Sequence, residues 1–340
     1  MSHECLKLTS YFGERDRAGD AFLADALSAL YARRGITTSI VLRGVEGFGA
    51  RHSLHTDRLL TLSEDLPIVS IAVDQPERIE AVHAALDELR FDGLVTLESA
   101  HFAADEGQEA WLPGEEAKVT VYVGRGDQLQ GAPAHVRLVE LFRRNGVAGA
   151  SVLLGVDGTA RGDWQRARFF GANSDVPVMV IAVGQRRAVA AALGELREAV
   201  PEAIITVEKV QVCKRDGERL PGFATTAKAR PGEHRKLMVY TGEQSRHGRR
   251  PLHHELIQRL RAAGAIGATS LRGIWGYHGE HAPHGDRLLQ LRRRVPVVTV
   301  IVDEAERAGE WLAIVDELTS EAGLVTSELV PQAWRRSRDA

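Results

Sequence analysis

Two stretches of the chain share a pattern of arginine, glycine and histidine that could bind a ligand. Residues 42–62 read LRGVEGFGARHSLHTDRLLTL, and residues 271–291 read LRGIWGYHGEHAPHGDRLLQL. Both place an arginine before Gly-x-x-Gly, then an aromatic residue, two histidines three apart and Asp-Arg-Leu-Leu. Such a loop is typical of a ligand site. The predicted ligand-binding residues are Glu14, Arg43, Gly44, Gly47, His52, His55, Arg58, Glu243, Arg272, Gly273, Gly276, His281, His284 and Arg287.

The two arginines, Arg43 and Arg272, allow two interpretations. A planar guanidinium at the mouth of a cleft can hold a carboxylate or a phosphate through two hydrogen bonds. Alternatively, Arg43 forms an ion pair with Glu14 or Glu46, which is about as common for a single arginine. Recurrence at one position favours ligand binding. The glycines that follow are predicted to allow a positive φ or the close approach of a ligand.

The loop histidines allow three interpretations. His52 and His55, like His281 and His284, could chelate Zn²⁺ or Cu²⁺, and His278 adds a further candidate ligand. No third ligand stands at a fixed spacing and no cysteine accompanies them. Contact with an anion or a nucleotide, or plain exposure to solvent, therefore remain open. No metal site and no cofactor are predicted.

A third copy of the loop, in the middle of the chain, lacks this chemistry. Leu154 stands in place of the arginine, and residues 162–166 read GDWQR in place of the histidines. Gly155, Gly158 and Pro177 are kept. This copy is predicted to be structural, so that the binding clefts should be inequivalent.

Catalysis and nucleic-acid binding are both disfavoured. The chain has no nucleophile elbow, no P-loop and no G-x-G-x-x-G that opens a helix. RNA-recognition modules stack bases on aromatic residues of their first and third strands. The candidate third strands here read IVSIAV, VMVIAV and VVTVIV and contain no aromatic residue. We therefore expect neither an enzyme nor a nucleic-acid-binding protein.

Composition is that of a globular protein of more than one domain. The 340 residues are 44% hydrophobic and 26% charged, with a formal net charge of −3. Only two cysteines occur, Cys5 and Cys213, without C-x-x-C spacing, which is typical of inert thiols in a reducing compartment. The pattern of a signal peptide and an apolar run of membrane-spanning length are both missing. A cytoplasmic location is the expectation.

The chain repeats one unit three times. Gly13, Gly124 and Gly242 are each followed by glycines at intervals of 22 and 31 residues. A unit of nearly 100 residues is too long for a solenoid repeat and suits a small domain. The predicted boundaries are 1–100, 118–212 and 236–330 for the units, 101–117 for an acidic linker, 213–235 for a basic Gly/Pro-rich linker, and 331–340 for a frayed basic tail.

Hydrophobic periodicity predicts the same elements in every unit. In the first unit these are strands at 6–12, 36–42, 68–73 and 94–97, and helices at 22–34 and from the N-cap Asp74 to about Phe91. Gly35 is the expected C′ residue of the first helix. The order β-α-β-loop-β-α-β gives two right-handed crossovers joined by a hairpin. That is an α+β, ferredoxin-like unit, with four antiparallel strands and two helices on one face.

The motifs YFGERD, LRGVEGFG, LSEDLPIV and GLVTLE resemble an uncharacterised bacterial family of PII-like domains, whose genes often lie beside fluoride-channel genes. The resemblance implies a trimeric assembly with small ligands, often adenine nucleotides, in clefts between subunits beneath a long loop. Three tandem units then imply a monomeric pseudo-trimer. It would bind a small anionic ligand or nucleotide and signal to a transporter or enzyme. Lysine is missing from the segments before the last strands, at 90–93, 200–203 and 320–323, which disfavours ATP.

Overall fold

A computed structural model describes residues 4–49, 54–56, 65–103, 114–160, 163–166, 176–226, 233–278, 284–285, 295–321 and 323–337. Each repeat has the predicted six elements. In repeat 1 these are β1 (Glu4–Gly13), α1 (Leu23–Arg33), β4 (Thr38–Arg43), β7 (Pro67–Asp74), α2 (Pro76–Ala85) with the 3-10 turn η1 (Leu86–Glu88), and β8 (Gly93–Phe102). In repeat 2 they are β9 (Glu116–Gly124), α3 (Ala134–Arg144), β12 (Gly149–Leu154), β15 (Pro177–Gln185), α4 (Arg186–Ala199) and β16 (Ile204–Lys209). In repeat 3 they are β19 (His234–Gly242), α6 (Leu252–Ala262), β22 (Gly267–Arg272), β25 (Pro296–Glu304), α7 (Ala308–Leu318) after η3 (Ala305–Arg307), and β26 (Leu324–Val330).

The four strands of every repeat form an antiparallel sheet in which the second, third, first and fourth strands lie in that order. A two-residue-strand hairpin precedes the first helix of each repeat. These hairpins are β2 (Arg17–Ala18) with β3 (Ala21–Phe22), β10 (Gln128–Leu129) with β11 (Ala132–Pro133), and β20 (Arg246–His247) with β21 (Arg250–Pro251). The predicted order of elements is confirmed, and the chain is an α/β protein built from three similar units.

The ends of the first helices agree with the prediction, whereas the start of the second helix does not. Gly35 follows α1 with φ of +65°, the left-handed conformation expected at C′. Asp74 was predicted as the N-cap of α2, but the N-cap is Gln75, without a side-chain cap. The Asp74 carboxylate instead accepts hydrogen bonds from the backbone N–H of Thr37, at 2.7 Å, and of Gln75, at 2.8 Å. It fixes the connection between helix and sheet.

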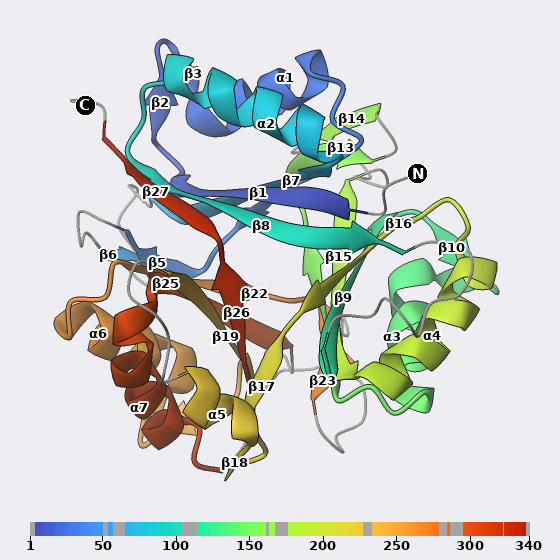
Figure 1. Cartoon of the computed structure of the whole chain (residues 1–340), viewed down its shortest axis with the longest axis vertical. Helices are drawn as coiled ribbons and strands as arrows, with labels where there is room; N and C mark the ends of the chain where they lie inside the picture. The colour runs from blue at the N-terminus through green and yellow to red at the C-terminus, as the bar shows by residue number, and fades with distance from the viewer. Residues whose placement is uncertain are drawn as a thin grey trace.

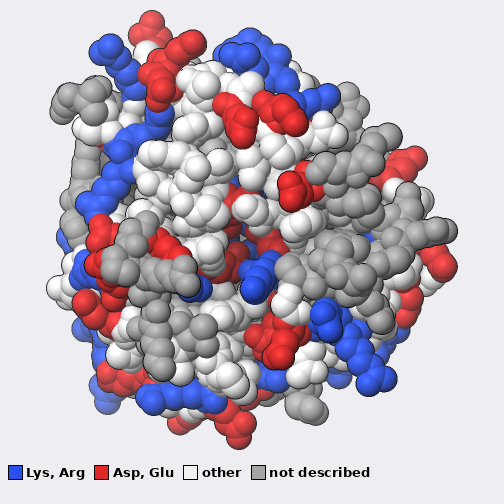
Figure 2. All heavy atoms as spheres, in the orientation of Figure 1, with Lys and Arg blue, Asp and Glu red and all other residues white. Residues whose placement is uncertain are grey.

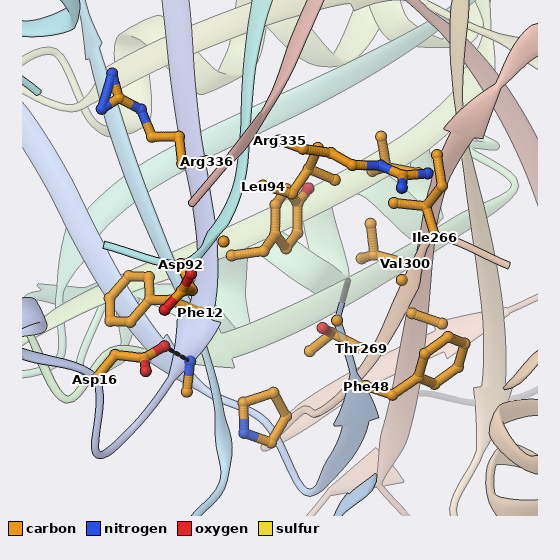
Figure 3. Close-up of a pocket in the computed structure, with 18 of the residues that line it drawn as sticks. Phe12, Asp16, Phe48, Asp92, Leu94, Ile266, Thr269, Val300, Arg335 and Arg336 are labelled. Carbon is orange, nitrogen blue, oxygen red and sulfur yellow. Dashed lines mark hydrogen bonds between the residues drawn. The ribbon is translucent and has the colours of Figure 1, made fainter. Parts of the chain in front are cut away.

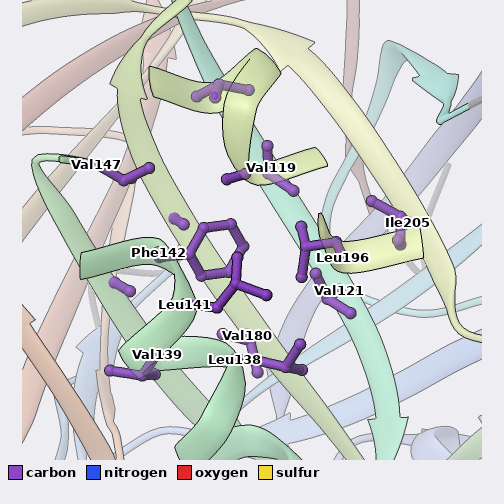
Figure 4. Close-up of a cluster of buried hydrophobic side chains, with 14 of the residues drawn as sticks. Val119, Val121, Leu138, Val139, Leu141, Phe142, Val147, Val180, Leu196 and Ile205 are labelled. Atoms are coloured by element: carbon purple, nitrogen blue, oxygen red, sulfur yellow. The ribbon is translucent and has the colours of Figure 1, made fainter. Parts of the chain in front are cut away.

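Both faces of each sheet are buried. The helices cover the outer face and form one core per repeat; the core of repeat 2 is drawn in Figure 4. The inner faces of all three sheets meet in a common central cluster, around which the helices lie on the outside (Figure 1). In β1, Leu8 packs under the helices and Cys5 faces the centre. Cys5 and Cys213 are both buried, and burial raises the pKa of the Cys213 thiol to about 11, in keeping with an inert thiol.

After its second strand, each repeat extends a short strand onto its neighbour; we call these strands the arms. They are β5 (Glu46–Phe48), β13 (Asp157–Ala160) and β23 (Trp275–His278). Arm β5 of repeat 1 pairs with β22 of repeat 3, β23 of repeat 3 with β12 of repeat 2, and β13 of repeat 2 with β4 of repeat 1. Each arm is also paired with a following strand, namely β6 (Leu54–Thr56), β14 (Asp163–Arg166) or β24 (His284–Gly285). The exchange of arms closes a ring of three.

The segments after the fourth strands make a second exchange, in the opposite direction. The end of β8 pairs with β16, β17 (Gln211–Arg215) pairs with β26, and β27 (Gln332–Arg336) pairs with β8. The prediction of a frayed tail is therefore wrong for residues 332–336. Their strand is held on repeat 1 by backbone pairing and by the ring of Trp334, which lies 4.1 Å from that of His83.

The described part of the predicted basic linker contains regular elements. It contains the end of β17, β18 (Glu218–Arg219) and the short helix α5 (Pro221–Thr226). Cys213 and Phe223 from this segment pack into the core of repeat 3. Among the described residues, no helix is both long and apolar enough to cross a membrane.

Candidate functional site

The predicted arginines lie in ion pairs. The Arg43 guanidinium donates to Glu14 through Nη2 and lies against it through Nε, both at 2.8 Å. Arg272 contacts Glu243 at 2.9 Å. These four side chains are between 22% and 43% exposed, so a ligand could still reach them. The ion-pair interpretation describes the arrangement seen, and ligand binding by the two arginines stays a prediction.

The predicted glycines lie where the arms contact the neighbouring repeat. A Cβ on Gly47 would stand 2.7 Å from the carbonyl oxygen of Ala268, and one on Gly276 only 2.4 Å from that of Ala150. Gly44 and Gly273 likewise face the proline that starts the third strand of their own repeat, at 2.7 and 2.6 Å. The close approach expected at these positions is that of another strand of the protein. Ligand contact by these glycines stays a prediction.

Four of the predicted ligand-binding residues lie outside the residues that the structure describes. They are His52, Arg58, His281 and Arg287. His55 is paired with Gly47 across β5 and β6, and His284 with Gly276 across β23 and β24, but the structure does not describe their side chains. Metal binding by the loop histidines stays the alternative interpretation.

A cleft between repeats 1 and 3 holds a cavity of about 500 Å³, which we call the 1–3 cleft (Figure 3). Its apolar lining includes Phe12 and Leu94 from repeat 1, Phe48 from the β5 arm, and Ile266 and Val300 from repeat 3. None of the predicted ligand residues that the structure describes lines it, although Gly13 and Phe48 are direct neighbours of predicted positions along the loops. A cavity of this size and character is in the range of small-molecule sites.

The polar groups of the 1–3 cleft are arranged by charge. Three carboxylates from repeat 1 line it, those of Asp16, Asp65 and Asp92. Asp16 accepts from the backbone N–H of Gly13 and Asp65 from that of Arg15, each at 2.8 Å, which holds both carboxylates in place. These groups can accept hydrogen bonds from hydroxyl or amino groups of a ligand.

The cationic groups of this cleft come from the C-terminal strand β27. Arg336 donates to the carbonyl oxygen of Leu86 and lies over the ring of Phe91. Its charge is balanced by an ion pair with Asp87. Arg335 extends across the cleft toward Ile266 (Figure 3). It is exposed and has no ion-pair partner within the described part of the chain. Arg335 is therefore the group best placed to bind an anion.

A second polar centre lies where the three sheets meet. Six charged residues, one lysine from each first strand and one glutamate from each last strand, form a closed ring of ion pairs. We call it the ion ring; its members are Lys7, Lys118, Lys236, Glu98, Glu208 and Glu328. Every lysine contacts two glutamates and every glutamate two lysines. The ammonium–carboxylate distances are 3.0 Å for Lys7–Glu98, 2.5 Å for Lys118–Glu328 and 2.8 Å for Lys236–Glu328.

All six members are at most 6% exposed, so the ring is a neutral but fully desolvated charge network. Burial alone would raise the pKa of the Glu98 and Glu208 carboxyl groups. The surrounding ammonium groups outweigh burial, holding the pKa of Glu98 well below its usual range and that of Glu208 at about 2. Burial likewise opposes the charge of Lys7, but Glu208 and Glu98 raise its pKa.

Sequence reasoning missed the ion ring, although a signal was present. A lysine stands four residues before Tyr11, Tyr122 and Tyr240, and a glutamate stands two residues after a threonine in each last strand. In an alternating strand, a lysine is normally assigned to the solvent face. The recurrence of one lysine and one glutamate at matching positions in all three repeats is the signal that these side chains pair inside the protein.

The ion ring predicts acid sensitivity. Because the folded-state pKa values of Glu98 and Glu208 lie below that of a free glutamate, about 4.3, the unfolded state binds more protons as the pH falls. The stabilisation is complete above about pH 5 and is lost as the pH falls toward 2. Urea midpoints measured from pH 6 to pH 2.5 should therefore decrease. The decrease should be shallower in Glu98→Gln, which has no proton to gain, and equal slopes would contradict the prediction.

Comparison with known proteins identifies the repeats. The model of the family DUF190, described as "Uncharacterized ACR, COG1993", matches residues 5–102, 116–212 and 234–332. Over 93 residues the chain is 33% identical to a UPF0166 protein of Aquifex aeolicus (strain VF5), an alignment that covers 27% of this chain and 86% of that protein. The relative thus has the length of one repeat. The chain belongs to the PII-like family DUF190 and carries three tandem copies of its domain.

Proposed function

We propose that the protein is a PII-like regulatory protein that binds a small anionic metabolite or nucleotide in the 1–3 cleft. In this proposal its repeats are ferredoxin-like units that form a covalently linked pseudo-trimer. The carrying observation is the cavity of about 500 Å³ between two repeats, with an apolar lining, carboxylates on one side and Arg335 on the other. A ligand with an apolar ring, hydroxyl or amino groups and one anionic group satisfies all three features.

The pseudo-trimer is supported by the two exchanges between repeats. Arms and last-strand extensions connect all three repeats in a closed ring, and the exchange partners are all in one chain. Isolated PII-like domains would need three chains to bury the same sheet faces. We therefore propose that this chain acts as a monomer in the cytoplasm.

Signalling, in this proposal, starts at the cleft. The β5 arm and β27 both line it, and both are segments that join repeat 1 to repeat 3. A ligand that contacts both is expected to stabilise their docking, since binding shifts the population toward the state that binds better. A partner transporter or enzyme would read that change. The proposed role is regulatory, not catalytic.

Replacing Arg335 by alanine is expected to weaken ligand binding at least about tenfold, because a charge-assisted hydrogen bond contributes about 1.5–3 kcal/mol. Ligands are first found by thermal-shift screening of nucleotides, small carboxylates, inorganic phosphate and divalent metals, because binding to the folded state raises the melting temperature. Affinity is then measured by calorimetry for the wild type and for Arg335→Ala.

Two further variants decide between the candidate sites. Arg137→Ala changes an exposed helical arginine paired with Glu140 and should leave affinity unchanged. Arg43→Ala tests the loop site. Loss of binding in Arg43→Ala with full binding in Arg335→Ala would move the site to the loop. A response to metals alone would instead favour the loop histidines, and steady turnover of a ligand would show an enzyme.

A further inference from the structure

A small cavity lies next to the ion ring, where the inner faces of the three sheets meet. It has a volume of about 40 Å³ and is lined by the lysines of the ring. On the face seen in Figure 2, acidic and basic side chains gather around a hollow near the centre of the molecule. Thr9, Tyr11, Thr120 and Tyr122 add hydroxyl-bearing side chains to the lining, and apart from the lysines the rest of it is apolar. We call this space the central cavity.

The lysines have more donors than the ring uses. An ammonium group carries three N–H donors, and each of Lys7, Lys118 and Lys236 contacts two carboxylates. Two carboxylate contacts leave each ammonium group with one N–H donor beyond the ion ring. All three lysines line the central cavity, so three spare donors surround one small space.

Tyr122 supplies an independent observation. Its side chain lines the central cavity, the residue is only 5% exposed, and its hydroxyl has no hydrogen-bond partner among the described residues. Leaving a buried hydroxyl without a partner costs its hydration, so such groups are rarely left unpaired. A ligand in the cavity that accepts hydrogen bonds would satisfy it.

We propose that the central cavity binds one small inorganic anion of about the size of a halide. The volume admits one to about three water-sized particles, which excludes a nucleotide or a large oxyanion. The ammonium groups and the Tyr122 hydroxyl around it are hydrogen-bond donors, and the positive charge of the ammonium groups favours an anion. The site is distinct from the 1–3 cleft and does not depend on the function proposed for it.

A cation is the less favourable occupant. Three carboxylate oxygens, one each from Glu98, Glu208 and Glu328, lie within 4.8 Å of one another, as in a metal site. However, every one of these glutamates is already paired with two ammonium groups, and the two carboxylate oxygens that accept no hydrogen bond among the described residues, Oε2 of Glu208 and Oε1 of Glu328, do not line the cavity. A cation would have to compete with those charges, and the cavity itself is lined by the lysines of the ring and not by its glutamates.

The protonation of Lys118 gives the site a pH dependence. Burial lowers the pKa of Lys118 to about 8, and the facing charges are Glu208, Glu328, Lys236 and Lys7. An anion beside the ring favours the charged ammonium. Anion affinity is therefore expected to be highest below pH 8 and to fall as the pH rises through it.

Bromide tests the proposal, because its anomalous scattering locates it in crystals of the full chain. We expect a bromide peak in the central cavity, and a melting temperature that rises with sodium bromide more than with sodium gluconate. Tyr122→Phe removes one donor and should weaken bromide binding about tenfold. This variant should still fold, since it removes a buried hydroxyl that has no protein partner.

Tyr31→Phe is the matched control. Tyr31 is also buried, but it lies in the outer core of repeat 1 and bonds with Ser70, at 3.2 Å. This variant should lose some stability and keep the full response to bromide. A cavity occupied by water or by a cation in bromide-grown crystals would overturn the proposal. So would equal responses to bromide in the wild type and Tyr122→Phe.

Discussion

Methionine in place of Lys236 is expected to lower the free energy of unfolding by about 3–5 kcal/mol, the usual cost of removing one partner from a buried ion pair. Lys236 is 4% exposed and contacts Glu98 and Glu328. Methionine keeps most of the volume and removes the charge. Both glutamates would then remain buried with one ammonium group each instead of two. Urea unfolding, followed by circular dichroism, measures the loss.

The neighbouring sequence offers a matched control. Lys209 follows Glu208 in β16 and is exposed, so Lys209→Met makes the same change outside the ion ring. Its effect should stay within about 0.5 kcal/mol. Adding Glu328→Gln to Lys236→Met restores the balance of charge and should recover part of the loss. Equal unfolding midpoints for Lys236→Met and Lys209→Met would show that the ring contributes no net stabilisation over an apolar centre.

We propose that the ion ring contributes to specificity of assembly. Hydrophobic packing tolerates sliding between sheets, but six alternating charges satisfy one another in only one register. Each glutamate pairs with one lysine of its own repeat and one of a neighbouring repeat, for example Glu98 with Lys7 and Lys236. A shift of any sheet would leave buried charges unpaired. The ring thus favours one arrangement of three similar repeats.

The order of elements could be predicted because local signals agree with one another in this chain. The helical stripe from Phe22, the stop at Gly35 and the β-branched run after it each indicate the same boundary. All of these signals act between residues close in sequence. The recurrence of glycines at equal intervals then extends the assignment from one repeat to three.

The contacts between repeats could not be predicted in the same way. Residues 332–336 read as a frayed basic end because their partner, β8, lies more than 200 positions earlier. Lys7 reads as a surface residue because alternation marks the two faces of a strand but does not tell whether the second face is covered. Arg43 could be assigned to a ligand or to Glu14, because that choice depends on a side-chain distance of 2.8 Å.

The sequence predicts the position of the 1–3 cleft only in part. The predicted loops do reach the boundary between repeats, since β5 pairs with β22 and Phe48 lines the 1–3 cleft. The charged group best placed in that cleft, Arg335, comes instead from a segment assigned to the tail. Its position depends on the exchange of last-strand extensions, which has no local signature in the sequence.

Alanine in place of Gly158 is expected to destabilise the protein by about 2–4 kcal/mol and to loosen the β13 arm from repeat 1. A Cβ at this position would lie 2.2 Å from the carbonyl oxygen of Ser39, 2.8 Å from Cγ of Pro177 and 2.9 Å from Cα of Ile40. Two of these atoms belong to the backbone of β4 and cannot turn away. The φ of Gly158, +154°, also lies in a region that L-residues rarely adopt.

The effect should be confined to one of the three exchanges. Gly158 pairs with Ile40, and the arm is further held by the hydrogen bond from the Val156 N–H to the Val41 carbonyl, at 2.8 Å. Hydrogen exchange followed by mass spectrometry should thus become faster in β4, at residues 38–43. Strand β12, which is covered by the β23 arm, serves as the internal reference and should keep its protection.

Gly194→Ala is the control for the substitution itself. Gly194 lies within helix α4, is exposed, and a Cβ there would meet nothing within 4 Å. Alanine is favoured over glycine in a helix by about 1 kcal/mol, so this variant should be slightly more stable than the wild type. Gly158→Ala could instead leave both the stability and the hydrogen exchange of β4 unchanged. That result would contradict the close contact between the β13 arm and repeat 1. Opposite signs for the two variants would support the close contact with β4 as the reason for glycine at position 158.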